Sequence, residues 1–245
     1  MSPSRPLAWV APGDALPAPD QALAEPNGLL AAGTDLSAAR LLEAYRHGIF
    51  PWYAPGQPVL WWSPDPRMVL YLDEFREHRS LRKTIRGMRA QGTWELTLNR
   101  DFAAVVRCCR AARAQQPGTW ITDEIAAAYL ELHHHGLAHS VELWHGTGAR
   151  ALLAGGLYGV SIGQMFYGES MFARVADASK VALAALVETL RGEGFCMLDC
   201  QQNTRHLASL GARVIPRARF LGEIAGLIER PGPNWSALHI DLPVS

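Results

Sequence analysis

Residues 139–201 decide the fold: HSVELWHGTGARALLAGGLYGVSIGQMFYGESMFARVADASKVALAALVETLRGEGFCMLDCQ. HSVELW and ALLAGGLYGV alternate as strands do, the turn residues 146–148 lie between them, and a third strand is expected near QMFYG. In DASKVALAALVETLRGEG, Leu183, Leu186, Val187 and Leu190 have the spacing of one buried helical face. FCMLDCQ predicts a further strand. The stretch therefore predicts a strand meander followed by a helix and a strand.

The same alternation continues on both sides of this stretch. Upstream, WELTL predicts a strand, DFAAVVRCCRAAR a helix, and residues 123–135 a second helix closed by Gly136. Downstream, HLASLG predicts a short helix and RARFLGEIAGLIER a terminal one. A strand, two helices, an antiparallel meander, then helix, strand and helix is the order of an acetyltransferase-like (GNAT-type) core. The expected fold class is α/β (α+β).

The amino-terminal segment differs in composition from the rest. A proline-rich lead precedes LSAARLLEAYRHG, which predicts a helix that Asp35 or Ser37 caps and Gly48 ends. Five prolines between Pro51 and Pro66 then forbid a regular helix. We therefore expect a small, compact helical amino-terminal domain over residues 1–65 and a catalytic domain over residues 66–245.

Composition limits the class of protein. The chain has 245 residues, 49% of them hydrophobic and 19% charged, with a formal net charge of zero. These values favour a well-filled core and argue against an overall basic nucleic-acid binder, although a local basic face is still possible. No signal peptide is visible, and five glycines make residues 151–168 a poor membrane span. With four cysteines inside predicted elements, a cytoplasmic protein with reduced thiols is expected.

Seven separated segments carry a specific resemblance. They are EPNGLLAAGTDLSAARLLEAYRHGIFPWY, WWSPDPR, GTWIT, HSVELW, GGLYGVSIGQMFYGESMF, ASKVAL and DCQQNTRHLASLGA. Together they span about residues 25 to 215 and resemble, in order, the leucyl/phenylalanyl-tRNA–protein transferases. One departure is Thr34-Asp35-Leu36-Ser37-Ala38, where that family usually shows Gly-Asp-Leu-Ser-Pro. It lies at a helix start, so it bears on local stability more than on chemistry.

The resemblance implies an activity and its partners. Leucine or phenylalanine (less well methionine) would move from aminoacyl-tRNA to a protein that begins with Arg or Lys, marking it for degradation. An ester becomes an amide, so the reaction runs downhill and no cofactor is expected. Neither a membrane nor DNA is an expected partner. The attacking α-amine has a reference pKa of about 7.7–8.0, so its free base costs only about 1 kcal/mol at neutral pH. The enzyme must mainly place the amine and stabilise developing charge.

Asp199 and Gln201 are the candidate catalytic residues. In Leu198-Asp199-Cys200-Gln201 they alternate along a predicted strand and should share a face. A carboxylate there can accept or orient the proton of the amine while the amide binds the tetrahedral oxygen. The resemblance places the family's proposed catalytic pair on these two residues. The alternative is a polar strand end that caps the next helix.

Further substrate contacts come from the resemblance. It implies that Glu169 helps to hold the acceptor and the amino-acid end of the donor. Without the resemblance, the local sequence predicts a surface glutamate after a turn. It also implies that the side-chain pocket involves Leu157, Met171, Leu183 and Leu198, each of which could equally be ordinary core. Trp52 and Trp120 are implied to cradle the terminal adenosine, since bases stack on aromatic faces; buried core tryptophan is the alternative.

A basic segment is the candidate contact for the body of the tRNA. REHRSLRKTIRGMR (76–89) holds six basic residues against a single Glu77. On a helix, Arg79, Arg82, Lys83 and Arg86 share one face that could follow phosphates, with Arg76 and Arg89 at the ends. The alternative is a solvated helix face.

Two rival functions and a metal site are alternative interpretations of parts of the sequence. An acyl-CoA-dependent N-acetyltransferase holds pyrophosphate with a glycine-rich loop before the central helix, but FARVADASK contains no glycine. A non-catalytic tRNA-binding protein is the other rival. His133, His134 and His135 with His139 suggest zinc, yet three adjacent histidines diverge on a helix. An exposed helix end without metal is expected.

Overall fold

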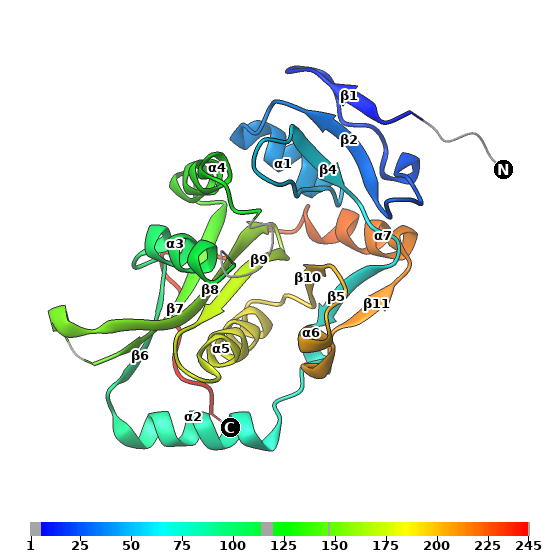
Figure 1. Cartoon of the computed structure of the whole chain (residues 1–245). Helices are drawn as coiled ribbons and strands as arrows, with labels where there is room; N and C mark the ends of the chain where they lie inside the picture. The colour runs from blue at the N-terminus through cyan, green and yellow to red at the C-terminus, as the bar shows by residue number, and fades with distance from the viewer. Residues whose placement is uncertain (1–5, 114–119, 147, 245) are drawn as a thin grey trace.

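The structure, a computed structural model, describes residues 6–113, 120–146 and 148–244. The first five residues of the lead, Gly118 and Thr119 of the GTWIT motif, and Thr147 of the predicted turn lie outside this range. The described residues form two sheets and several helices (Figure 1). The helices are α1 (Ala38–Arg46), α2 (Arg79–Gln91), α3 (Phe102–Arg113), α4 (Asp123–His134), α5 (Ala178–Gly192), α6 (Arg205–Ser209) and α7 (Arg217–Leu227), with 3-10 turns at Pro19–Gln21, Leu72–Glu74 and Gly148–Arg150.

The strands divide between the amino-terminal segment and the rest of the chain. The first sheet has the order β1-β2-β4-β3, and the second β11-β5-β10-β9-β8-β7-β6. Their bounds are β1 Ala8–Val10, β2 Leu29–Gly33, β3 Phe50–Pro51, β4 Val59–Trp62, β5 Arg67–Tyr71, β6 Trp94–Leu98, β7 Ala138–His145, β8 Leu152–Ile162, β9 Met165–Ala173, β10 Met197–Gln201 and β11 Arg213–Ile215.

The prediction of a helical amino-terminal unit was wrong. Among the described residues of this segment, α1 is the one α-helix, beside a 3-10 turn at Pro19–Gln21, and the four-stranded sheet packs beside α1 (Figure 1). LLAAG in β2 is buried at all five positions, so it shows no strand alternation that the sequence could reveal. The prolines do exclude a long helix, and Pro51 lies in the short edge strand β3, where a missing N–H is tolerated.

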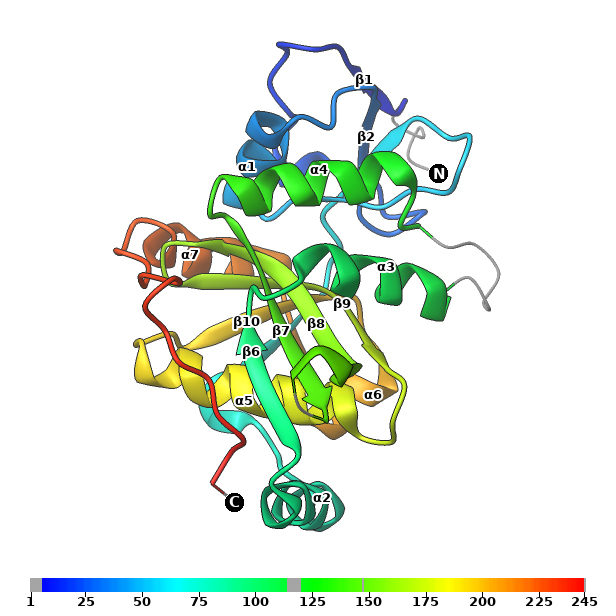
Figure 2. The same ribbon diagram turned by 90° about the vertical axis from the view of Figure 1, so that its left-hand side faces the viewer.

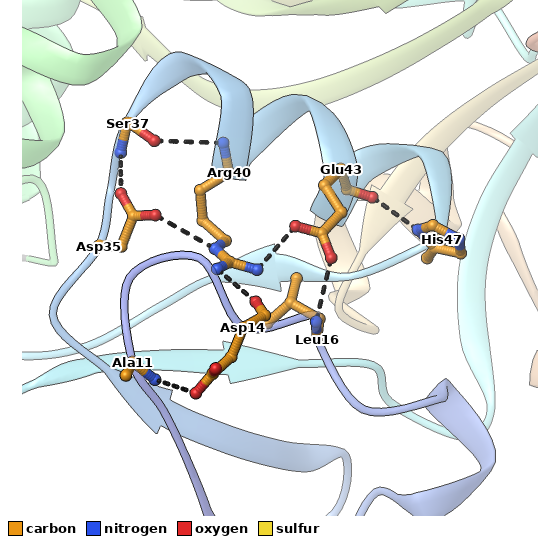
Figure 3. Close-up of polar contacts among 8 residues, drawn as sticks. All are labelled: Ala11, Asp14, Leu16, Asp35, Ser37, Arg40, Glu43 and His47. Carbon is orange, nitrogen blue, oxygen red and sulfur yellow. Dashed lines mark hydrogen bonds and ion pairs between the residues drawn. The ribbon is translucent and has the colours of Figure 1, made fainter.

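Helix α1 also anchors the lead segment (Figure 3). Ser37 caps it by accepting a hydrogen bond from Arg40 N (3.3 Å), while Asp35 accepts from Ser37 N (2.9 Å). The Arg40 side chain is buried and donates to the carbonyl oxygen of Asp14 and to Glu43 (both 2.6 Å), and Glu43 accepts from Leu16 N. The helix start at Thr34–Ala38 therefore has a hydrogen-bonded N-cap, and the Arg40–Glu43 ion pair holds the lead segment against the helix.

The seven-stranded sheet follows the predicted order of elements. All its described neighbours are antiparallel except β9 and β10, which run parallel on either side of the α5 crossover. Helix α5 covers one face, while α3 and α4 cover the other (Figures 1 and 2). Two cores follow from this: one contains residues of α2 and α5, and the other residues of α1, α3, α4 and α7. The mixed α/β class is confirmed, and β5 and β11 are additions to the predicted set.

Helix α5 lies deeper than its periodicity suggested. Nine of its residues are buried, including Ala182, Ala184 and Ala185 beyond the predicted leucine and valine face. The long uncharged stretch at 151–168 forms β8 and part of β9, as expected. Within the described residues, no helix has the length and apolar character needed to cross a membrane. All four cysteines are unpaired.

Candidate active site

One cavity of about 590 Å³ gathers the predicted catalytic and substrate-binding residues. It opens beside the carboxyl end of β10 and is bounded by β8, β9, α5 and the loop after β3. Its volume is in the range of small-molecule sites. The predicted residues that line it are Trp52, Trp120, Leu157, Glu169, Met171, Leu183, Leu198, Asp199 and Gln201.

Asp199 forms a buried ion pair that the sequence did not predict. Arg67, the last residue of WWSPDPR, donates from Nε to Asp199 Oδ1 (2.8 Å) and from Nη2 to Oδ2 (2.7 Å). Both side chains are 0% exposed. The third guanidinium nitrogen donates to Gly48 O (3.0 Å), and the rings of Phe50 and Phe220 each lie 4.7 Å from the guanidinium carbon. Both carboxylate oxygens of Asp199 are therefore occupied by Arg67.

Gln201 does not continue the simple strand alternation that was expected. The register of β10 against β5 shifts between Asp199 and Gln201, and Gln201 has a φ of 61°. Such a left-handed conformation costs about 1–3 kcal/mol for a non-glycine residue. Gln201 N donates to Asp199 Oδ1 (2.9 Å), which stabilises this bend. The bend lets the Gln201 amide donate from Nε2 to Glu169 Oε1 (2.7 Å).

Glu169 is a buried acid that lines the cleft. It is only 7% exposed, so the surface-glutamate alternative was wrong. Tyr45 donates to its Oε1 and Tyr129 to its Oε2, each at 2.7 Å, and the two phenol oxygens are 2.5 Å apart. Burial raises the pKa of Glu169 from its ordinary value of 4.5 to about 7, although hydrogen bonds from Tyr129, Tyr45 and Gln201 act to lower it.

The apolar wall of the cavity comes from four elements. Leu157 of β8 is directly opposite Met171 of β9, Leu183 projects from α5, and Leu198 lies on β10. Leu157, Leu183 and Leu198 are at most 4% exposed, while Met171 is half-buried. The wall is continuous with the core around α5. The cavity can therefore hold an aliphatic or aromatic side chain beside Glu169 and Gln201.

The two tryptophans differ in exposure. Trp52 is 39% exposed and packs edge-on against Trp62, with ring centroids 5.4 Å apart. Trp120 is 8% exposed, and the guanidinium carbon of Arg113 lies 6.0 Å from its ring centroid. Trp52 therefore presents much of its ring at the mouth of the cavity, whereas Trp120 is mostly covered.

The basic helix is separate from the cavity. Arg79, Arg82, Lys83 and Arg86 are exposed on α2, whose buried residues Leu81, Ile85 and Met88 face the core. The two outer members of the predicted set differ from these four. Arg76 precedes the helix, and Arg89 donates to the carbonyl oxygens of Leu242 and Pro243, which ties down the carboxyl-terminal segment.

The histidines are not simply an exposed helix end, so that prediction was wrong in part. His133 stacks on Phe102 with ring centroids 4.3 Å apart. His139 is buried on β7 and stacks on Trp235, and burial lowers the pKa of His139 to about 3. Both line a second cavity of about 630 Å³, which contains none of the predicted site residues. The described residues hold no group of three or more His, Cys, Asp or Glu side chains placed to bind a metal.

Arg67, Tyr45 and Tyr129 were missed as site residues. Tyr45 lies on the buried face of α1 and Tyr129 on that of α4, and in sequence their spacing is that of ordinary core residues. The available signal was chemical: phenols within apolar faces usually find a partner when buried. Arg67 is an arginine between Pro66 and an apolar run, and a buried arginine requires an acid.

The fold and the site together define the class of protein. It is an α/β protein whose apolar cleft holds a buried acid and an amide. Residues 69–225 match the family model described as leucyl/phenylalanyl-tRNA protein transferase, and residues 34–65 match the model of that family's N-terminal domain. The chain belongs to the leucyl/phenylalanyl-tRNA–protein transferase family.

Curated relatives are similar over nearly the whole chain. A leucyl/phenylalanyl-tRNA–protein transferase of Bordetella petrii is 52% identical over 240 residues, covering 96% of this chain and 93% of the relative. Those of Paraburkholderia phytofirmans and Cupriavidus necator are 54% and 55% identical, each covering at least 92% of this chain and 90% of the relative.

Proposed function

We propose that this chain transfers leucine or phenylalanine from aminoacyl-tRNA to the N-terminal Arg or Lys of acceptor proteins. Its membership of the transferase family supports the reaction, and the relatives at 52–55% identity carry the same name. Addition of a bulky hydrophobic residue would mark the acceptor for degradation. Since charged tRNA is the donor, the proposed compartment is the cytoplasm.

We also propose a GNAT-type core over residues 66–245 with a small domain over residues 1–65. The parallel β9–β10 pair within an otherwise antiparallel sheet, bridged by α5, supports this assignment. Acyl-CoA enzymes have a glycine-rich loop before this helix, whereas the segment before α5 has no glycine. Its Asp177 carries an acidic side chain that pairs with Lys180 (2.7 Å). An acid at that helix start would disfavour pyrophosphate.

For the chemistry, we assign Asp199 a positioning role. Its oxygens are occupied by Arg67 and by the Gln201 N–H, so its contribution would be to hold Gln201 in the bent conformation. The Gln201 side chain would then contact the reacting groups. One N–H is given to Glu169, which leaves the second N–H for the tetrahedral oxygen and the amide oxygen for the attacking amine.

The remaining site residues would bind the two substrates. Leu157, Met171, Leu183 and Leu198 would enclose the leucyl or phenylalanyl side chain, since burying it stabilises binding by about 1.5–3 kcal/mol. Trp52 and Trp120 would flank the terminal adenosine, with Trp52 the more available face. Glu169 would hold the acceptor amine. The α2 face, with Arg76 and Arg89 at its ends, would contact tRNA phosphates.

The observation that carries this proposal is the convergence in one cavity of an apolar pocket, an aromatic rim and the Glu169–Gln201 pair. The test mixes purified protein, leucyl-tRNA labelled on leucine and a peptide that begins with Arg. Label should appear on the peptide and not on the same peptide with an acetylated amino terminus. If acetyl-CoA modifies the peptide and leucyl-tRNA does not, the protein is an N-acetyltransferase. If leucyl-tRNA binds without transfer, it is a non-catalytic tRNA-binding protein.

A further inference from the structure

Glu169, which lines the cleft, forms a closed ring of short contacts with two fully buried tyrosines, Tyr45 and Tyr129. Tyr45 Oη and Tyr129 Oη are 2.5 Å apart, and each lies 2.7 Å from one oxygen of Glu169. Gln201 Nε2 donates to Glu169 from outside the ring (2.7 Å). Tyr45 and Tyr129 are both 0% exposed. The ring unites α1, α4 and β9, which lie far apart in the sequence.

The ring needs one proton more than its tyrosines provide. Three oxygen–oxygen contacts close it, and each hydrogen bond requires one proton. Tyr45 and Tyr129 contribute two. If Glu169 were ionised, both phenol protons would point at its carboxylate, and the two phenol oxygens would meet at 2.5 Å with no proton between them. A proton on Glu169 lets each of the three groups donate once and accept once.

The surroundings also favour a neutral acid. The titratable or charged groups that interact with the ring are Tyr158 of β8 and Asp199 of β10, and Cys109 and Arg113 of α3 lie beyond Tyr158. Arg113 donates to Ser170 (3.0 Å), and Asp199 adds a negative charge that Arg67 opposes. Among the described residues, Glu169 has no ion-pair partner within 4.0 Å. Burial without a cation favours the uncharged carboxyl group.

Resting on the proposed transfer reaction, we propose that Glu169 is a neutral carboxylic acid in the resting enzyme and carries the transferred proton. Tyr45 and Tyr129 are positioning residues that hold its carboxyl group in place through the ring. As the amine nitrogen attacks, the N–C bond forms and the carbonyl π electrons move to oxygen. The oxyanion pair then re-forms the carbonyl, and the C–O bond to the ribose breaks with its electron pair leaving on the ribose oxygen. Glu169 gives its proton to the leaving ribose oxygen and takes one from the new ammonium nitrogen, so it ends each turnover neutral.

The protonation state can be measured without turnover. Infrared difference spectra between the full-length protein and Glu169→Gln, recorded across pH, should show the C=O band of a protonated acid that disappears as pH rises through about 7. Tyr45→Phe and Tyr129→Phe each remove a donor to the carboxylate, so both should move the midpoint to higher pH. A carboxylate signal that persists well below pH 7 would overturn the proposal.

Two substitutions serve as matched controls. Tyr167→Phe removes another buried hydroxyl, one without a hydrogen-bond partner among the residues that the structure describes, and should leave the midpoint unchanged. Glu142→Gln removes another fully buried carboxyl group, bonded to Thr97 and Ser140 outside the cleft, and should leave the Glu169 band in place. A midpoint that Tyr167→Phe moves as far as Tyr45→Phe does would also contradict the ring.

Kinetics provide the second measurement. We expect kcat for leucine transfer to fall as pH rises through the Glu169 midpoint, and the fall should move to higher pH in Tyr45→Phe. Glu169→Gln should lower kcat by about 100-fold or more with the KM for tRNA unchanged. If the wild-type protein transfers leucine with Glu169 ionised, the proton-carrying role fails and the proposed function stands. If it transfers nothing at any pH, the proposed function fails whatever the infrared titration reports.

Discussion

The buried Arg67–Asp199 pair allows a prediction that separates stability from catalysis. The perturbation is a double-mutant cycle of Arg67→Met, Asp199→Leu and the combination. Each single change leaves one charge buried at 0% exposure with its partner gone. Both hydrogen bonds of the pair, at 2.7 and 2.8 Å, are lost, although Arg67 would keep its bond to Gly48 O.

The expected magnitude follows from that burial. Removing one partner of a buried pair costs about 3–5 kcal/mol, out of a total free energy of unfolding of about 5–15 kcal/mol. In the double variant no charge is left unpaired, and methionine can pack between the rings of Phe50 and Phe220 that flank Arg67. The double variant should therefore lose less than the sum of the singles, with a coupling energy of about 2 kcal/mol or more.

Urea unfolding monitored by fluorescence measures the stabilities, and leucine transfer measures kcat. With a slope of about 3 kcal/mol/M, each single variant should show its midpoint lowered by about 1 M or more. The double variant should fold, but its kcat should be lower than that of the wild-type protein, because Gln201 N has lost its acceptor on Asp199. The stability argument is refuted if each single variant loses less than about 1 kcal/mol of unfolding free energy and the double variant loses the sum of the two. Full kcat in the double variant would refute the positioning of Gln201.

Three further predictions concern pH, tRNA and side-chain selection. The pKa of Glu169 rises from 4.5 in the unfolded chain to about 7 in the folded one, so the folded state binds more protons in this range. The free energy of unfolding should therefore fall by about 3 kcal/mol as the pH rises from 4.5 to 7, and it should level off above pH 7. Unfolding of Glu169→Gln across this window should lack that decline, and an identical pH dependence would contradict it. Reversing Lys83 and Arg86 to Glu should weaken tRNA binding and reduce its salt dependence, with kcat at saturating tRNA unchanged; binding insensitive to salt would exclude the α2 face. Leu183→Ala should enlarge the pocket and reduce kcat/KM for leucine more than for phenylalanine. Competition between leucyl-tRNA and phenylalanyl-tRNA measures this preference, and an unaltered preference would show that the apolar wall does not contact the substrate.

Much of the architecture was predictable because its signals are local. The helices from α1 to α7 carry amphipathic spacing, caps or terminal glycines, and each lies close to its expected range. Gly48 and Gly136 have positive φ values of 68° and 70°, which suits residues that end helices. The strands that were missed lack local contrast. β2 is buried at every position, and β5 begins with a buried arginine, so neither alternates between apolar and polar residues.

By itself, the sequence determined the helices, the order of strands β6 to β10, the mixed α/β class and the resemblance that nominated the cleft residues. Only the tertiary structure decided how their polar atoms are paired. Arg67 and Asp199 are 132 residues apart, and Glu169 is 124 residues from Tyr45 and 40 from Tyr129. Periodicity reports which face of an element is buried, but it carries no information about which distant polar group will lie opposite. That choice depends on how the elements pack, because a buried polar group must find its partner across the core.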